Sequence, residues 1–185
     1  RDYSLKHIEK YGSDEPEIND FVSKLGNDVA DAASGQDNGR GGIFEPSLFT
    51  YSFFMTWGSK YPATPDGRKA GEYFSRGMGP AERNTGVLTS MLNSSFNIPM
   101  DKYPGGGVLD ITLPIGGNID KNILSSVIRN FVDGGGSILQ ISLNDTTILL
   151  KAQKNPDDYQ NLTVRLYGFS AYFTTLQPVQ QDEII

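Results

Sequence analysis

The sequence predicts an α/β protein built from βαβ units of a parallel sheet. Runs rich in aliphatic residues predict strands at 108–113 and 137–143, and a further strand is expected from about residue 163. Amphipathic helical patterns lie between these runs, and turn residues bound each of them. Because strands that alternate with helices form consecutive βαβ units, the stretch from 108 to 167 predicts strands that run parallel.

The first half of the chain is expected to hold two helices and one strand. Asp14 can cap a helix over 15–33, because Pro16 and the neighbouring acidic residues suit a first turn. Alternating aromatic and hydroxyl residues predict a strand at about 47–55, and residues 85–95 can form a short helix. The first helix carries apolar residues at helical spacing, namely Ile18, Phe21, Val22, Leu25 and Val29.

A clear amphipathic helix separates the two central strands. Asn118 or Asp120 can cap it, and Gly134 is expected to end it. Its apolar face should pack against the sheet, and this face comprises Ile123, Leu124, Val127, Ile128 and Phe131.

Two further helices follow. Asn144 or Asp145 can cap a short helix, which the Asn-Pro pair at 155–156 stops. A last helical pattern covers 178–185, where the chain ends. Because the chain begins at Arg1 without methionine and stops inside that pattern, we expect it to be a fragment of a longer protein or one chain of a cut protein.

The composition narrows the range of functions. The formal net charge of −6 argues against nucleic-acid binding, and the absence of cysteine excludes disulfides, thiolate metal sites and a thiol nucleophile within this chain. His7 is the only histidine, so we expect neither a catalytic triad nor a metal site. No apolar run approaches the roughly 20 residues that span a bilayer, so no membrane attachment is expected. Without disulfides or a signal peptide, the expected location is the cytoplasm.

Polar catalytic sites find little support in the motifs. The glycine-rich stretch 34–42 lacks the lysine and the spacing of a phosphate-binding loop. Arg68 follows a Pro-Asp-Gly turn, which favours a surface position. The alternatives for Arg68 are a buried ion pair or contact with an anionic substrate.

One glycine remains unexplained by ordinary structure. Gly168 interrupts an apolar and aromatic run at 164–173, which otherwise predicts a buried strand. A glycine in such a run marks a bulge or a place where the backbone approaches another group closely. Gly168 is therefore the leading candidate for the chemical centre of the chain.

Several segments, in order along the chain, resemble the C-terminal part of glycyl radical enzymes. They are Ala63-Thr64-Pro65-Asp66-Gly67-Arg68, Gly134-Gly135-Gly136-Ser137-Ile138-Leu139-Gln140, Ala152-Gln153-Lys154-Asn155-Pro156 with Tyr159, and Val164-Arg165 followed by Gly168. The family includes pyruvate formate-lyase, glycerol and diol dehydratases, choline lyase and arylacetate decarboxylases. The resemblance implies the C-terminal part of a ten-stranded β/α barrel with an inserted glycine loop. It implies barrel residues at 1–150 and a glycine radical domain at 151–185.

The resemblance further implies that Gly168 carries a stable backbone radical. An amide nitrogen and a carbonyl flank the α-carbon and delocalise the unpaired electron, and glycine has no Cβ to resist flattening. Because such a radical reacts with oxygen, the aromatic residues Tyr167, Phe169, Tyr172 and Phe173 are expected to wall it off, with Tyr167 and Phe169 supporting the loop. Arg165 is expected to anchor the loop, and Arg68 to have a structural role or to lie near the substrate.

The same resemblance implies partners. No cofactor is expected in this chain, because a radical-SAM activating enzyme, which uses S-adenosylmethionine and an iron–sulfur cluster, installs the radical. The radical then passes to a cysteine, which must come from the remainder of the enzyme or from a partner chain, and the complete enzyme is expected to be a homodimer. The run at 169–173, with Gln181 and Ile184-Ile185 beyond it, resembles the dehydratase, lyase and decarboxylase branch more than pyruvate formate-lyase. This likeness implies radical dehydration, lyase or decarboxylation chemistry on a small molecule.

Three alternatives stay open. The chain can belong to a pyruvate formate-lyase, that is, a formate C-acetyltransferase. It can be a stand-alone spare part that repairs an oxygen-cleaved enzyme of that kind. It can also be a binding or structural α/β module without a radical, an interpretation that gains if the strand around Gly168 is exposed.

Overall fold

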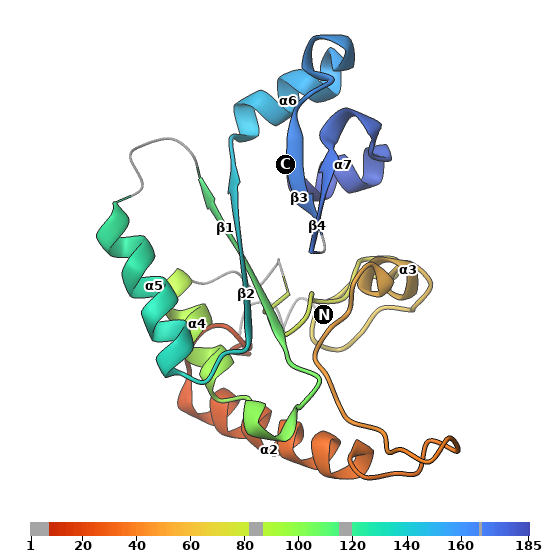
Figure 1. Ribbon diagram of the computed structural model, residues 1–185, viewed down its shortest axis with the longest axis vertical. Helices are drawn as coiled ribbons and strands as arrows, with labels where there is room; N and C mark the ends of the chain where they lie inside the picture. The colour runs from red at the N-terminus through yellow and green to blue at the C-terminus, as the bar shows by residue number, and fades with distance from the viewer. Residues whose placement is uncertain (1–7, 82–86, 115–119, 167) are drawn as a thin grey trace. The chain divides into compact units, whose positions relative to one another are not determined.

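The computed structural model describes residues 8–81, 87–114, 120–166 and 168–185. These residues form two compact units, the first made of the chain up to Leu109 with 128–139, the second of 110–127 with 140–185. Helices and short strands alternate in a mixed α/β arrangement (Figure 1), which confirms the predicted class. The predicted boundary at residue 150 stays a prediction. No described helix is both long and apolar enough to cross a membrane.

Helix α2 (Pro16–Ala33) opens the first unit and matches its predicted extent. Its capping differs, because Glu15 occupies the cap position without a side-chain bond to the helix. Asp14 instead accepts hydrogen bonds from Asn19 and from Asn93 of α4 (Leu88–Phe96), so it ties the two helices together. The start of the helix expected over 85–95 lies outside the described residues. Much of the apolar face of α2 is exposed in this chain, at Phe21, Leu25 and Val29.

The predicted strand at 47–55 is wrong. The backbone turns at Tyr51, whose φ is +44°, and then enters helix α3 (Phe53–Gly58). Among the described residues of this stretch, sheet pairing is limited to a single parallel bridge between Leu48 and Gly107. The aromatic alternation has another cause, since the rings of Phe49 and Tyr51 pack edge to face with centroids 4.1 Å apart.

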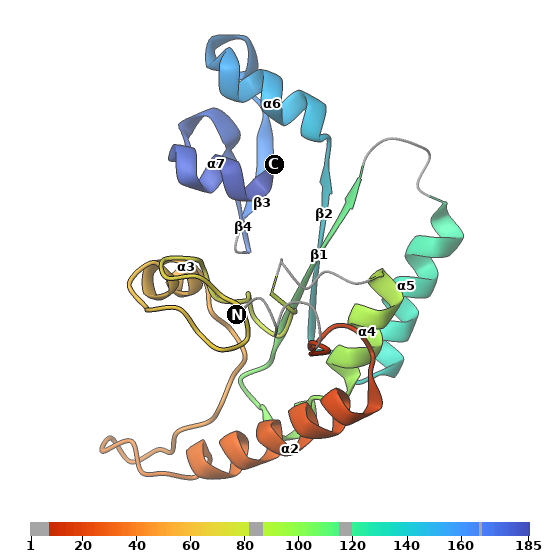
Figure 2. The ribbon, with the colours of Figure 1, turned by 180° about the vertical axis from the view of Figure 1, so that it is seen from behind.

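The first predicted βαβ unit is present. Strands β1 (Val108–Pro114) and β2 (Ile138–Asn144) form a two-stranded sheet. Their arrows point the same way in Figure 1, and both views place helix α5 (Lys121–Asp133) beside them (Figures 1 and 2). Asp120 begins this helix, because its side chain accepts a hydrogen bond from the Asn122 amide. The predicted alternative, Asn118, lies outside the described residues.

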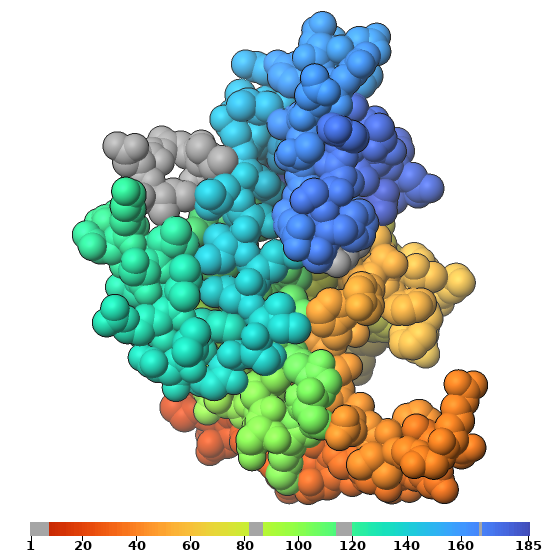
Figure 3. Space-filling view, viewed as in Figure 1, coloured from red at the N-terminus to blue at the C-terminus, as the bar shows by residue number. Residues whose placement is uncertain are grey.

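Helix α5 ends at Asp133, directly before Gly134, as predicted. The left-handed residue is Gly135, whose φ is +80°, rather than Gly134. The Gly136 amide donates back to the Phe131 carbonyl, which closes the helix end. Val127 and Phe131 of the predicted apolar face are buried, whereas Ile123 and Ile128 are exposed in this chain. The helix accordingly lies at the surface in the space-filling view (Figure 3).

The second predicted βαβ unit is wrong. Strand β3 (Thr163–Leu166) pairs antiparallel with β4 (Phe169–Tyr172) in a sheet of its own, with Leu166 opposite Phe169. Consequently, the run at 164–173 is a hairpin rather than one strand. The positive φ at Gly168 permits this tight reversal, because a two-residue turn needs such a residue.

A small core holds the hairpin in the second unit. Leu149 and Ala152 of helix α6 (Thr146–Lys154) pack with Val164 and Phe173, and all four side chains are buried. Helix α7 (Pro178–Ile184) contributes Gln181, which donates to the Phe173 and Leu176 carbonyls. The partly buried residues around this core are Tyr159, Leu162, Leu176, Ile184 and Ile185.

We expect Asp145→Ala to destabilise helix α6 by about 1 kcal/mol, because a cap aspartate satisfies amides that the helix leaves free. The Asp145 carboxylate accepts from the Thr147 amide at 2.9 Å and from the Ile148 amide at 3.2 Å. Hydrogen exchange at these two amides is the measurement, and exchange should become faster. Asp157→Ala, at an exposed aspartate beyond the helix, is the control. Equal exchange in the two variants would rule out the cap.

Candidate functional site

The candidate site is the tip of the β3–β4 hairpin, where Gly168 lies. Its φ of +90° is a conformation that residues with a side chain rarely adopt. Apart from its chain neighbours, a Cβ built on Gly168 would meet none of the described residues within 4 Å, and Gly168 is exposed in this chain. Steric crowding therefore does not explain why this position is a glycine, whereas its positive φ does.

The amide of Gly168 is held by a side chain from another element of the same unit. Its N–H donates to Oε1 of Gln140 over 3.0 Å, and Gln140 lies half-buried in the middle of β2. This bond ties the hairpin tip to the strand. The sequence offered no signal for the contact, because strand alternation places Gln140 on a face of β2 without indicating what lies opposite.

Arg165 lies next to the tip on the exposed face of β3. Val164 and Leu166 on either side of it are buried, as strand alternation requires. Arg165 is paired in register with Ser170, and its Nη1 donates to the Ser170 hydroxyl over a long 3.4 Å. The described contact therefore bridges the two strands of the hairpin. Its predicted anchoring role stays a prediction.

The predicted aromatic enclosure of Gly168 is not formed by the described residues. Phe169 and Tyr172 each leave 51% of their surface exposed, while Phe173 is fully buried in the core of the second unit. Tyr167 lies outside the described residues. The expectation of a buried strand is therefore wrong at the tip. The described residues of the second unit therefore leave the tip open.

Arg68 belongs to the first unit, and its predicted surface position is wrong. It is only 1% exposed. Its guanidinium donates to the carbonyls of Gly58 at 3.2 Å and Glu72 at 2.7 Å, and also to that of Pro62. It also lies over the ring of Phe74, 4.6 Å from the centroid. These contacts hold the two ends of the loop 58–74 together, which is a structural arrangement.

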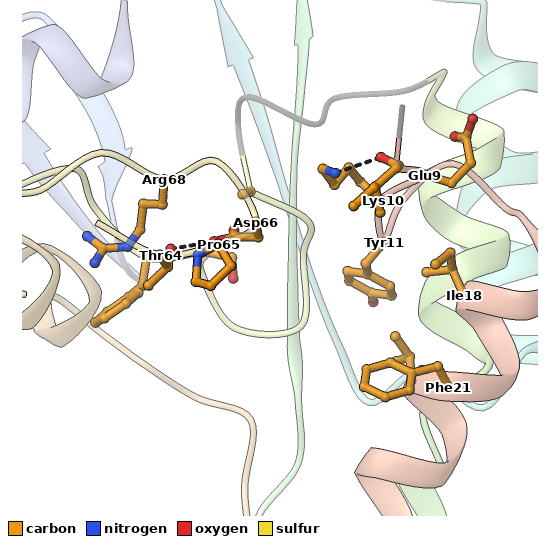
Figure 4. A pocket seen from close by; sticks show the side chains of 14 residues that line it. Glu9, Lys10, Tyr11, Ile18, Phe21, Thr64, Pro65, Asp66 and Arg68 are labelled. Atoms are coloured by element: carbon orange, nitrogen blue, oxygen red, sulfur yellow. Dashed lines mark hydrogen bonds between the residues drawn. The ribbon is translucent and has the colours of Figure 1, made fainter. Parts of the chain in front are cut away.

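A pocket of about 610 Å³ lies beside Arg68 in the first unit. Figure 4 shows Thr64, Pro65 and Asp66 on one side, facing Tyr11 and Phe21 across the space. Burial raises the pKa of Tyr11 above its ordinary value, and its hydroxyl donates to the Met78 carbonyl. A phenol held in this way stays neutral and occupied, so it does not supply a base. No cluster of described residues has the donors to hold a metal ion.

Comparison with known proteins places the chain in a family. The family model described as "Glycine radical" matches residues 74–174, more than half of the chain. The chain therefore belongs to the glycine radical family, as its motifs predicted. The matched segment contains the β3–β4 hairpin and Gly168.

The chain is similar to dehydratases and to a formate acetyltransferase. The probable dehydratase YbiW of Escherichia coli strain K12 is 30% identical over 95% of this chain and 23% of its own length. Formate acetyltransferase 1 of the same organism is 26% identical over 95% of this chain and 25% of its own length. The glycerol-bound B12-independent glycerol dehydratase of Clostridium butyricum superposes with a TM-score of 0.89 at 33% identity, covering 97% of this chain and 23% of that one. The chain thus spans about a quarter of the length of these relatives.

Proposed function

We propose that Gly168 stores the backbone radical of a glycyl radical enzyme that carries out dehydration or related radical chemistry on a small molecule. One observation carries the proposal. Within a segment that matches the glycine radical family, Gly168 sits at an uncrowded hairpin tip with φ of +90° and its amide held by a side chain. At such a tip the α-carbon of Gly168 is accessible to an approaching radical. The far end of the hairpin is held in the core of the second unit.

The radical chemistry suits this residue. One hydrogen atom leaves the α-carbon to a radical-SAM activating enzyme, and the unpaired electron that remains is shared with the amide nitrogen and the carbonyl. At φ of +90° the peptide plane on the nitrogen side stands perpendicular to the plane of the N–Cα–C bonds. Conjugation with the nitrogen requires these planes to coincide, so formation of the radical involves rotation at Gly168. Glycine permits that rotation because it has no Cβ.

The remainder of the enzyme completes the site in this proposal. A cysteine thiol outside this chain gives its hydrogen atom to the glycyl radical, and the resulting thiyl radical attacks the substrate. The chain itself holds no cysteine. We assign 1–150 to the ten-stranded β/α barrel and 151–185 to the glycine radical domain, within a cytoplasmic homodimer. The barrel then covers the surfaces of Phe169 and Tyr172 that this chain leaves open.

The relatives favour the dehydratase branch. Identity is 30% to the probable dehydratase and 33% to the glycerol dehydratase, against 26% to the formate acetyltransferase. Formate acetyltransferase chemistry remains the second candidate, because that enzyme matches over the same share of this chain. A spare-part protein is favoured by one observation only, namely that the second unit has its own small core.

Electron paramagnetic resonance of the anaerobically activated full-length protein tests the proposal. We expect a doublet from the single remaining α-hydrogen, which requires Gly168. Assays with a glycerol-like diol and with pyruvate plus coenzyme A then separate the two chemistries. Restoration of activity to an oxygen-cleaved enzyme by this chain alone would favour the spare part. An unchanged doublet in Gly168→Ala would reject Gly168 as the radical site.

A further inference from the structure

The contact between Gln140 and Gly168 carries an inference beyond the radical itself, although it rests on the function proposed above. We propose that Gln140 is a positioning residue, which holds the amide group of Gly168 while the α-carbon changes from tetrahedral to planar. The bond joins Gly168 N to Gln140 Oε1 over 3.0 Å, within the second unit. The donor is an N–H, so the side-chain atom that accepts must be the oxygen of the amide.

The described residues of the hairpin provide no partner for this N–H. The described pairing of β3 with β4 ends at Leu166 and Phe169, so Gly168 lies beyond the ladder. Apart from its chain neighbours, no described residue lies within 4 Å of the position where a Cβ of Gly168 would stand. An amide beyond a ladder otherwise depends on water for its hydrogen bond. Water is an unsuitable neighbour at a site that must exclude solvent and oxygen, and Gln140 replaces it with a protein acceptor.

Gln140 lies in a part of the chain that is expected to move little, so it can hold the Gly168 amide in one position. It occupies the third position of β2, between Leu139 and Ile141, and its side chain is half-buried. A residue in a paired strand moves less than a residue at a hairpin tip. When the N–Cα bond of Gly168 rotates, its amide nitrogen therefore stays in place. The carbonyl group of Gly168, which leads into β4, moves instead.

The same hydrogen bond acts on the electronic structure of the radical. The amide nitrogen donates electron density to the electron-poor α-carbon, while the carbonyl withdraws it. An acceptor at the N–H increases the electron density on nitrogen, because hydrogen bonds polarise the groups that they join. Gln140 therefore strengthens the donor half of the delocalisation, and it should lengthen the life of the radical.

The test uses the full-length enzyme, activated anaerobically, with Gln140→Leu, Gln140→Asn and Gln140→Glu. Electron–nuclear double resonance in H₂O and in D₂O measures the coupling of the exchangeable amide proton of Gly168. We expect Leu and Asn to change this coupling and to shorten the radical lifetime by about two- to tenfold, the range that one net hydrogen bond supports. Glu keeps an oxygen at the same reach, so it should restore the coupling and most of the lifetime.

A matched control separates this role from a structural one. Gln160→Leu alters an exposed glutamine of the same unit that is not bonded to Gly168, and it should leave coupling and lifetime unchanged. A wild-type enzyme without a radical at Gly168 would overturn the proposed function. If the wild-type enzyme forms the radical, and Gln140→Leu has the same amide-proton coupling and the same radical lifetime as the wild type, then only the role of Gln140 is overturned. A loss in Leu that Glu does not restore would also contradict it, since packing would then be the cause.

Discussion

Replacing Gly168 by alanine is expected to abolish both the radical signal and turnover of the activated full-length enzyme. Turnover should fall by roughly 10⁶-fold or more, since the chemistry loses its radical store and enzymic accelerations start at about that size. Apart from its chain neighbours, the added methyl group meets none of the described residues within 4 Å, so the fold should tolerate it. The cost is the strain of a positive φ, about 1–2 kcal/mol. Turnover assays and circular dichroism together measure the two effects.

Gly135→Ala is the control for backbone strain. Gly135 has φ of +80°, and a Cβ there likewise meets no described residue within 4 Å other than its chain neighbours. It therefore imposes a similar conformational penalty at the end of α5 without touching the hairpin. We expect this variant to retain the radical and turnover. Loss of turnover to the same degree in both variants would attribute the effect of Gly168→Ala to folding rather than to chemistry.

Arg68→Met is expected to be the most destabilising substitution in the first unit, at about 3–5 kcal/mol. The side chain is 1% exposed, and its loss leaves the carbonyls of Gly58, Pro62 and Glu72 without this donor. The bond to Gly58 is buried and the other two are partly buried, so these carbonyls pay much of their desolvation cost when they lose a charged donor. Hydrogen exchange across residues 58–74, with the thermal midpoint of the full-length protein, measures the change.

Two further substitutions define the cause. Arg68→Lys should recover only part of the stability, because one ammonium cannot reach carbonyls that a planar guanidinium spans. Arg40→Met, at an exposed arginine, should change stability by no more than about 0.5 kcal/mol. If Arg68→Met leaves exchange over 58–74 unchanged and instead abolishes substrate turnover, the arginine lies near the substrate and the structural account is wrong.

Local patterns predicted helices α2, α5 and α6 well. Proline at the start of α2, aspartate before α6 and glycines after α5 act through bonds a few residues away, so sequence alone reveals them. The strand expected at 47–55 failed because aromatic alternation also arises when two rings pack together across a turn. The second parallel unit failed because four-residue strands on either side of a glycine can pair with each other instead.

The candidate site was predictable only in part. Gly168 stands out as a glycine in an aromatic run, and the ordered motifs give it a chemical meaning. The sequence does not indicate the partners of Gln140 and Arg68. Gln140 binds the amide of Gly168, which lies 28 residues away. Arg68 binds backbone carbonyls of its own loop. Burial of a charged side chain against carbonyls is a tertiary property, so a turn motif predicts a surface position for Arg68.

The central claim is that the unpaired electron resides on the α-carbon of Gly168. Oxygen adds to such a carbon and cleaves the backbone there, so the claim is tested by mass spectrometry of the activated full-length enzyme after exposure to air. The radical signal is quantified in the same sample beforehand. The account predicts that one of the two backbone bonds of the Gly168 α-carbon breaks, which releases residues 169–185 either alone or with the two carbons of Gly168 as an acyl group on the Phe169 nitrogen, in an amount that matches the lost signal. Loss of the signal with an intact chain, or with cleavage at another residue, would contradict it.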